Sequence, residues 1–445
     1  MSPVLGLPSL VLFLWTVAGV LVSAVLSLVP ALHVYNVAGF LILAVARWGT
    51  SIPMEGLIFF FLGLVAGYAI FNTIPSIFLS VPDDSTVFIV LPGQKYLLQR
   101  RGYEAVVLAG LGGLGGIAVL ALLTPVASTW LPTIRAIVQP HLAWILWTII
   151  AFMLISEWPK GAERAPAGLR RWWEGWRSLT AGLATFLLSG LLGLVLMYRS
   201  VAPVEVAYQN LLPAFIGLFA VPWVLQNLLG RTEIPPQHFA PSVDAGFGTM
   251  VRGTLAGALG GLFAAFFPVV TGGIGGFLAG HATAQRDERL FIISQGASKV
   301  VYYVGGFLFF FIPGFQRVKG GLASMLSTIY SGTSPQLYLL AVGAVVLAGA
   351  LAFFLSLGLT RLMVALLARI HYRWISLATL GILLLIVLGM TGPAGLLVCA
   401  VATGIGLIPL LWGSRRMNCM GVLLLPIALN MAGVGDAVAG WLGLL

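Results

Sequence analysis

Two stretches of this sequence combine helix-breaking residues with side chains that can bind ions. The first is FNTIPSIFLSVPDDSTVFIVLPG, residues 71–93, where each of three prolines removes a backbone donor and interrupts a helix. Ionisable groups at membrane depth are costly and usually functional. We therefore predict that four consecutive residues hold a coupling cation or proton: Asp83, Asp84, Ser85 and Thr86. Asp84 has an alternative role as a cap of the helix that follows. Thr73 and Ser76 are assigned to the substrate site.

The second stretch is FFPVVTGGIGGFLAGHATAQRDER, residues 266–289, in which Pro268 breaks a helix and a glycine cluster follows. Glycines that open a half-helix expose several backbone N–H groups, which together with the helix dipole favour an anion. Five residues are predicted to bind the substrate in this way: Thr271, Gly272, Gly273, Gly275 and Gly276. Close helix packing is the alternative, and we prefer it for the regularly spaced Gly253, Gly257 and Gly261.

His281 and Arg286 follow the glycine cluster and extend the predicted substrate site. An arginine offers a planar fork to a carboxylate or phosphate, so this pair would line the entrance of an anion path. The alternative is that His281 is an ordinary core residue. Arg286, with the three charged residues after it, would then mark the membrane boundary.

The composition is that of a polytopic membrane protein. Of 445 residues, 60% are hydrophobic and 8% are charged, and the mean hydropathy is +1.04. A soluble domain needs roughly a quarter of its residues charged. The net charge of +10 comes from basic residues in short loops, which indicates anionic lipid and not nucleic acid as the partner. Two cysteines and scattered histidines predict no metal site and no cofactor, and no motif indicates an enzyme.

The apolar runs predict an all-α fold with about 10–12 transmembrane helices, each needing about 20 residues. The first run, 4–29, lacks the basic start of a signal peptide and is predicted to be a retained helix. Polar loops are expected at several places, including 94–101 and 283–299. The confident spans are 4–29, 31–47, 103–124, 141–156, 178–198, 211–229, 300–316, 334–356, 374–390, 393–412 and 417–441.

Two further apolar regions, 55–93 and 253–282, are broken in their centres and repeat the same order of features. Each runs from a glycine-rich helix through a proline-containing break to a polar stretch. We predict a two-fold internal repeat, with a first membrane domain over 1–200 and a second over 201–445. Transporters are often built from such repeats, with the substrate held between broken helices near the membrane midplane.

Three segments resemble the large membrane subunit of the tripartite tricarboxylate transporter family, in its shorter archaeal form. They are TIPSIFLSVPDDSTVFIVLPGQKYLLQRRGYEAV (73–106), GTLAGALGGLFAAFFPVVTGGIGG (253–276) and GLIPLLWGSRRMNCMGVLLLPIALNMAG (406–433). Where the family usually has a Pro-Gly turn, Pro268 is followed by Val269. The resemblance implies a carrier of organic anions, polycarboxylates in the best-known members, driven by an ion gradient. It also implies a small membrane subunit and an extracytoplasmic binding protein as partners.

The sequence therefore predicts a multi-pass secondary active transporter of an organic anion in the cell membrane. The alternative is a translocase for a lipid-linked phosphate, such as a polyprenyl phosphate. That function would use the same glycine cluster but would need a lateral opening to lipid. A closed aqueous cavity would instead favour a small solute.

Overall fold

The protein is helical throughout the part of the chain that the computed structural model describes, and no strand occurs among these residues. Eight described helices are long and apolar enough to cross a membrane, or nine spans if a bent pair near the C-terminus counts as one. These observations confirm an all-α polytopic membrane protein. The described residues are 7–29, 33–34, 37–39, 41–42, 45, 52–158, 167–200, 210–230, 234–239, 242–243, 245–315, 320–327 and 330–445.

The chain forms two compact units, each made from two separate parts of the sequence. The first unit comprises 1–135 and 232–375, and the second comprises 136–231 and 376–445. Both predicted broken segments, 55–93 and 253–282, belong to the first unit. The predicted repeat, with domains 1–200 and 201–445, concerns sequence symmetry and stays a prediction.

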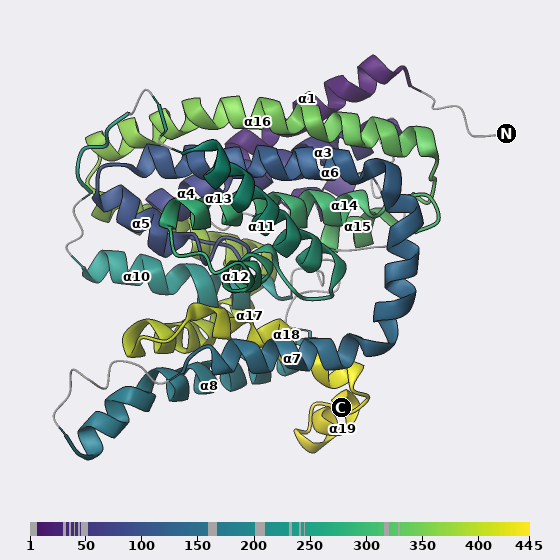
Figure 1. Cartoon of the computed structure of the whole chain (residues 1–445). Coiled ribbons are helices and arrows are strands. Elements are labelled where there is room, and N and C mark those ends of the chain that lie inside the picture. The colour runs from purple at the N-terminus through teal and green to yellow at the C-terminus, as the bar shows by residue number, and fades with distance from the viewer. Residues whose placement is uncertain are drawn as a thin grey trace. The chain divides into compact units, whose positions relative to one another are not determined.

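The helices of the first unit are shown in Figure 1. They are α1 (Ser9–Leu26), α3 (Met54–Phe71), α4 (Thr73–Phe78), α5 (Val90–Leu98), α6 (Gly102–Val138, whose last turn passes into the second unit), α11 (Phe247–Phe266), α12 (Gly272–Ala282), α13 (Glu288–Val300), the π-helical η5 (Val301–Gly305), α14 (Gly306–Leu308), α15 (Gly320–Ser327) and α16 (Pro335–Arg369).

The centre of the first unit is α3, in which 15 of 18 residues are buried. Its backbone touches that of α1, since a Cβ atom on Gly63 would lie 1.9 Å from the carbonyl oxygen of Thr16. In lipid, where burial of apolar surface drives little association, glycines permit the close backbone approach that van der Waals packing requires. Figure 1 shows α3, α6 and α16 running side by side, and Gly349 of α16 packs directly on Ile117 of α6.

The first predicted break is a non-helical stretch between α4 and α5. Pro82 lies within it, and Ser80 has a left-handed backbone with φ 57°. Pro75 and Pro92 fall in the first turns of α4 and α5. Backbone N–H groups in the first turn have no partner within the helix, so proline removes no helical hydrogen bond there. The prolines therefore start two short helices instead of interrupting one long one.

The second predicted break separates α11 from α12. Helix α11 ends at Phe266, and α12 begins at Gly272 with Thr271 as its N-cap. Between them Val269 has φ 52°, the left-handed region that glycine tolerates and β-branched residues avoid. A valine therefore adopts a left-handed backbone at the position where the resembled family usually has glycine.

The second unit contains the remaining described helices. They are the 3-10 turn η1 (Gln139–His141), α7 (Leu142–Ile155), α8 (Leu169–Tyr198), α9 (Leu212–Phe215), the π-helical η4 (Ile216–Ala220), α10 (Val221–Leu229), α17 (Tyr372–Trp412, whose first residues belong to the first unit), the 3-10 turn η6 (Arg416–Met420), α18 (Gly421–Met431) and α19 (Gly435–Trp441).

One predicted span boundary appears as a break in these helices, and one predicted span is itself broken. Within α17, Gly392 has φ 71° and precedes Pro393, which divides the helix between the predicted spans 374–390 and 393–412. The segment predicted as one span over 417–441 is bent by 114° between α18 and α19. The predicted span 31–47 lies mostly outside the described residues. The predicted polar loop 283–299 is wrong from residue 288 onward, which is helix α13, and the predicted loop 94–101 is wrong over 94–98, which belong to α5.

Candidate functional site

Asp83, in the break between α4 and α5, is the centre of a buried hydrogen-bond network. Its Oδ1 accepts from the backbone N–H of Ser85 at 3.0 Å and from both the N–H and the hydroxyl of Thr86 at 2.8 Å. These bonds fix the DDST turn locally, which is the capping geometry expected of a short acidic side chain. Asp83 therefore caps the turn at 84–89 and not a helix. The helix-capping role that the sequence offered for Asp84 is wrong, because α5 begins at Val90 with Ile89 as an N-cap that makes no side-chain bond.

The other oxygen of Asp83 is bound by side chains from distant elements. Oδ2 accepts from Tyr68 of α3 at 3.0 Å, from Asn72 at 2.6 Å and from Tyr303 of η5 at 2.9 Å. With three donors on each oxygen, the carboxylate is stabilised in its ionised form, because charge-assisted hydrogen bonds are the strongest kind. Asp83 thereby joins the acidic turn to α3 and to η5 of the first unit.

Asp84 is held less tightly than its neighbour. Tyr303 reaches its Oδ1 at 3.2 Å, so one phenol bridges the two adjacent carboxylates. The backbone carbonyl of Asp84 accepts from the Thr271 hydroxyl at 3.1 Å. That bond directly links the two broken segments, which lie 187 residues apart in sequence.

Lys299 of α13 places a buried positive charge in the same network. Its side chain is 2% exposed, and its ammonium donates to Asn72 Oδ1 at 2.5 Å and to the Thr73 hydroxyl. The amide of Asn72 donates in turn to Asp83. A buried charge needs both a counter-charge and hydrogen bonds. Lys299 has both through this short chain of contacts.

The predicted polar residue Ser76 completes the inner side of the network. Its hydroxyl lies 2.9 Å from Thr86 Oγ1 and 2.7 Å from the backbone carbonyl of Asn72. A small cavity adjoins this point and is lined by eight residues, namely Ser27, Val29, Tyr68, Asn72, Pro75, Ser76, Val81 and Asp83. Of the candidates, Ser76 and Asp83 line this cavity. Thr86 hydrogen-bonds with both of them, and Thr73 joins the network through Lys299.

His33 adds a ring to the network. Its Nε2 is 3.1 Å from the Tyr303 hydroxyl, and its ring centroid is 5.0 Å from that of Tyr68. His33, Asp83 and Asp84 offer ligand atoms within 4.8 Å of one another, a spacing that one cation would span. Because both oxygens of Asp83 already accept three hydrogen bonds, the lone pairs that a metal would take are used by protein donors. The donor set therefore fits a hydrogen-bonded carboxylate better than a metal ligand.

The glycine cluster divides into two functional parts. Gly272 and Gly273 face the network, since added Cβ atoms would lie 3.1 Å from Lys299 Cα and 2.9 Å from the Asp84 carbonyl oxygen, respectively. Thr271 caps the helix they open by accepting from the Ile274 N–H at 3.5 Å. The N-terminus of α12 thus meets both the acidic turn and Lys299.

Gly275 and Gly276 lie against neighbouring helices instead. A Cβ atom on Gly275 would lie 2.1 Å from the carbonyl oxygen of Gly260 in α11, and one on Gly276 would lie 2.7 Å from Gln295 Nε2 in α13. Both positions serve the close helix contact that was the alternative interpretation. Their predicted role in substrate binding stays a prediction.

His281 and Arg286 lie at the opposite end of α12 from Gly272 and are exposed. The helix has 11 residues, which corresponds to roughly 16 Å at about 1.5 Å per residue. His281 Nδ1 is 3.0 Å from the Phe277 carbonyl oxygen. The structure does not bring this pair to the buried network, and a role at the entrance of the site stays a prediction.

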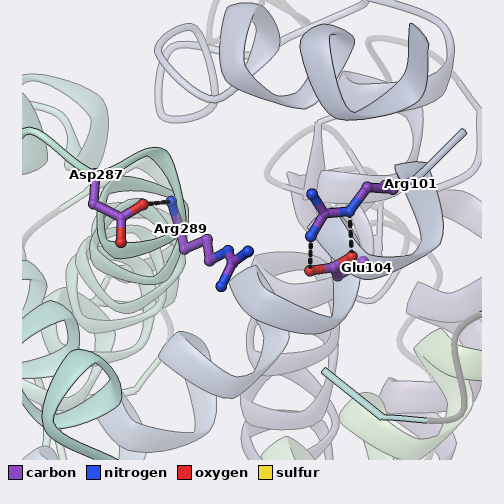
Figure 2. Close-up of polar contacts among 4 residues, drawn as sticks. All are labelled: Arg101, Glu104, Asp287 and Arg289. Carbon is purple, nitrogen blue, oxygen red and sulfur yellow. Dashed lines mark hydrogen bonds and ion pairs between the residues drawn. The ribbon is translucent and has the colours of Figure 1, made fainter. Parts of the chain in front are cut away.

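The charged residues that follow each broken segment meet at the polar ends of α5 and α13. Lys95 of α5 forms an ion pair with Glu288 of α13, and Tyr96 hydrogen-bonds with Arg289. Figure 2 shows Asp287 accepting from the Arg289 backbone at 2.9 Å, which caps α13. Partial burial raises the pKa of the Tyr96 phenol. The two segments therefore return to polar surroundings side by side.

Figure 2 also shows the start of α6, where Arg101 binds Glu104 through two parallel bonds of 2.7 and 2.6 Å. These hydrogen bonds raise the pKa of the guanidinium. The guanidinium also lies 4.9 Å from the centre of the Tyr96 ring. Arg101 thus fixes the turn that connects α5 to α6.

Sequence reasoning missed five members of the network: His33, Tyr68, Asn72, Lys299 and Tyr303. The sequence analysis places Lys299 in a polar loop and assigns the two tyrosines no role. A signal was present, because Gln295, Lys299 and Tyr303 are spaced by four and share one face of a helix. A polar face on an otherwise apolar helix indicates contact with a buried polar site.

A helical membrane protein in which two broken segments meet around buried charges has the architecture of a membrane transporter. The chain belongs to the tripartite tricarboxylate transporter TctA family, which it matches over residues 13–421. The match confirms the resemblance and shows that the chain is a component of a tricarboxylate transporter. The chain is also similar to an uncharacterized protein of Methanocaldococcus jannaschii, with 25% identity over 422 residues, 94% of this chain and 98% of that protein. No solved structure matches it.

Proposed function

We propose that this protein is a secondary active transporter of an organic anion of the polycarboxylate type, located in the plasma membrane and coupled to an ion gradient. The observation that carries the proposal is the junction of the two broken segments. Thr271 binds the backbone of Asp84 there, and the N-terminus of α12 packs against Lys299. Family membership supports a tricarboxylate as the substrate class.

The charges of the junction suit an anionic substrate. Lys299 has two acceptors within the described part of the chain, so one of its three N–H donors remains for a ligand. The opening residues of α12 belong to the same junction, with Gly272 against the backbone of Lys299 and Gly273 against the carbonyl oxygen of Asp84. An ammonium and a helix N-terminus together would bind a carboxylate group, because both present donors and positive potential.

The adjacent acidic turn suits the coupling ion. Asp83 and Asp84 are buried or half-buried carboxylates that share the Tyr303 hydroxyl. An ion that binds here would change the charge next to the substrate position. Such proximity is the basis on which an ion gradient is coupled to the movement of an anion.

The family is named for a tripartite assembly. We therefore extend the proposal to two partners, a small membrane subunit and an extracytoplasmic binding protein that delivers the anion. His281 and Arg286 would lie on the route by which the anion enters.

Uptake by purified protein in liposomes tests the proposal. We expect citrate or a related polycarboxylate to accumulate under a proton or sodium gradient. Gly273→Ala should reduce uptake at least ~10-fold, because a methyl group there meets the Asp84 carbonyl oxygen. Gly358→Ala, in α16 with no neighbour within 4 Å, is the matched control. A ~10-fold loss corresponds to about 1.4 kcal/mol of lost binding.

Unchanged uptake by Gly273→Ala would contradict the placement of the substrate. Transbilayer movement of a polyprenyl phosphate without uptake of any soluble carboxylate would favour the lipid-linked phosphate translocase instead. Both assays use the same protein preparation, so the two functions are compared directly.

A further inference from the structure

We propose that the Lys299 ammonium is a tethered cation that occupies the place a sodium ion would take, and that the coupling ion is therefore a proton carried by Asp84. The inference rests on the proposed function and specifies its coupling ion. It depends on where the ammonium lies, which oxygens surround it and how the nearby charges balance.

The ammonium sits where a monovalent metal ion would find its ligands. Its two contacts are oxygen atoms, the amide Oδ1 of Asn72 and the hydroxyl of Thr73. Both belong to the junction of α3 and α4, at the start of the broken segment. Oxygen atoms at broken helices are the usual ligands of a coupling sodium ion in transporters. Here a covalently attached cation uses them, and a second cation at the same place would be repelled.

The ammonium also has its own counter-charge. Asn72 relays it to Asp83, and the attraction between Lys299 and Asp83 is mutual. Asp83 receives six hydrogen bonds that favour its ionised form. Lys299 and Asp83 therefore form a neutral pair that remains in place.

Asp84 is the carboxyl group left over from this pairing. The titratable or charged groups that face it are Asp83 beside it, Tyr303 of η5, Tyr68 of α3 and His33, whereas Lys299 of α13 acts on Asp83 and Tyr302 lies against Tyr303. Two adjacent carboxylates repel each other when both are ionised, and a single nearby cation balances only one of the two charges. Binding of a proton to an Asp84 oxygen neutralises the network, and its release to water restores one negative charge.

The charge of Asp84 connects the proton to the substrate. With Asp84 protonated, the positive potential of Lys299 and of the α12 N-terminus acts on the anion without opposition from a second carboxylate. With Asp84 ionised, that negative charge repels the anion and promotes its release. Proton and anion therefore move together, and no bond other than the O–H of the Asp84 carboxyl forms or breaks.

Sodium binding to the purified protein gives the first test, and it does not depend on transport. Unfolding temperatures are compared in NaCl and in choline chloride of equal ionic strength. We expect no sodium-specific shift for the natural protein. Lys299→Met vacates the cation position and should gain a sodium-specific rise of several degrees, since a ligand that binds only the folded state stabilises it. Lys95→Met removes the ion-paired lysine of α5 and should gain none.

The coupling test uses liposomes. An inward proton gradient without sodium should drive anion accumulation, and a sodium gradient at fixed pH should not. Asp84→Asn should lose at least ~10-fold of the stimulation of anion accumulation by the proton gradient, and a ~10-fold loss corresponds to about 1.4 kcal/mol.

A sodium-specific shift of the natural protein, or accumulation driven by sodium alone, would overturn the inference while leaving the proposed function intact. Failure to transport any organic anion under either gradient would remove the proposed function. If Lys299→Met does not fold, the comparison of sodium and choline on the natural protein still decides whether a sodium site exists.

Discussion

Lys299 and Asp83 are joined through the single amide of Asn72, which accepts from the ammonium at 2.5 Å and donates to the carboxylate at 2.6 Å. The amide has one orientation that satisfies both neighbours, because the reverse would turn its NH2 group toward the ammonium. Asn72 thus connects α3 to α13 and to the acidic turn. Substitution of Asn72 should therefore destabilise the first unit strongly, although the side chain is small.

Asn72→Leu should lower the free energy of unfolding by about 3 kcal/mol or more, because it removes two hydrogen bonds to charged groups. Lys299→Met removes the other end of the same chain of contacts. The double variant should be less destabilised than the sum of the two single variants, by about 1 kcal/mol or more. Denaturant unfolding in detergent measures this, and strict additivity would show that the residues act independently.

Asp83→Asn and Asp84→Asn should differ in stability although the residues are neighbours. Asp83 accepts six hydrogen bonds, three on each carboxylate oxygen. In Asp83→Asn an NH2 group replaces one of these oxygens, so three donors would face another donor. We expect a loss of about 3–5 kcal/mol for Asp83→Asn, typical of a broken buried charge network. Asp84→Asn should cost less than about 1.5 kcal/mol, because a single bond from Tyr303 is affected. Equal unfolding temperatures would contradict the assignment to Asp83 of the bonds that hold the acidic turn.

Val269→Gly should leave the protein as stable as before or stabilise it by up to about 1 kcal/mol. The left-handed backbone at Val269 costs about 1–3 kcal/mol for such a residue. Glycine removes this cost, but the more flexible unfolded chain then loses more conformational entropy on folding, which destabilises the protein by roughly 0.5–1 kcal/mol. The neighbouring Val270 is fully buried, and Val270→Gly should cost about 2–4 kcal/mol. Thermal unfolding of the two variants measures the contrast, and similar losses would argue against strain at Val269.

Gly275→Ala should destabilise the contact between α11 and α12. The new methyl group would lie 2.1 Å from a backbone oxygen of Gly260, which cannot move without shifting the helix. Overpacking of this kind costs about 1–3 kcal/mol or more. Gly358→Ala meets nothing within 4 Å and should gain about 0.5–1 kcal/mol from helix propensity. If both substitutions raise the unfolding temperature, the close helix approach is not present.

Arg416→Lys should weaken the second unit by about 1–3 kcal/mol. The guanidinium donates to the backbone carbonyls of Leu218 and Phe219 at 3.0 and 2.7 Å, in the π-helical turn η4. It also lies 4.9 Å from the centre of the Trp223 ring. A lysine cannot reproduce this planar arrangement. The exposed Arg170→Lys is the control for unfolding temperature, and an equal effect of the two changes would contradict a structural role for Arg416.

The helical fold and both breaks were predictable, because apolar length, proline and glycine determine local structure in a membrane directly. The break at Gly392 and the N-cap at Thr271 follow from the same local rules. The acidic turn was also identified, but its roles were not, since the choice between Asp83 and Asp84 depends on donors from other helices.

Lys299 shows why the rest of the site escaped prediction. Its place in the sequence, between a charged stretch and an apolar run, is the same for a loop residue and for a buried one. Its charge can be buried because the oxygens of Asn72 and Thr73, more than 220 residues earlier, accept hydrogen bonds from the ammonium. Such long-range pairings are absent from local sequence patterns.

The separation of Tyr303 from Asp83 by 220 residues has a consequence for biosynthesis. At about 5–20 residues per second, translation needs roughly 10–45 s after Asp83 emerges before its last hydrogen-bond donor exists. During that time the acidic turn lacks its partners and is unsuited to contact with lipid. The nascent first unit must therefore be sheltered, by water or by the insertion machinery, until α13 and η5 arrive and close it.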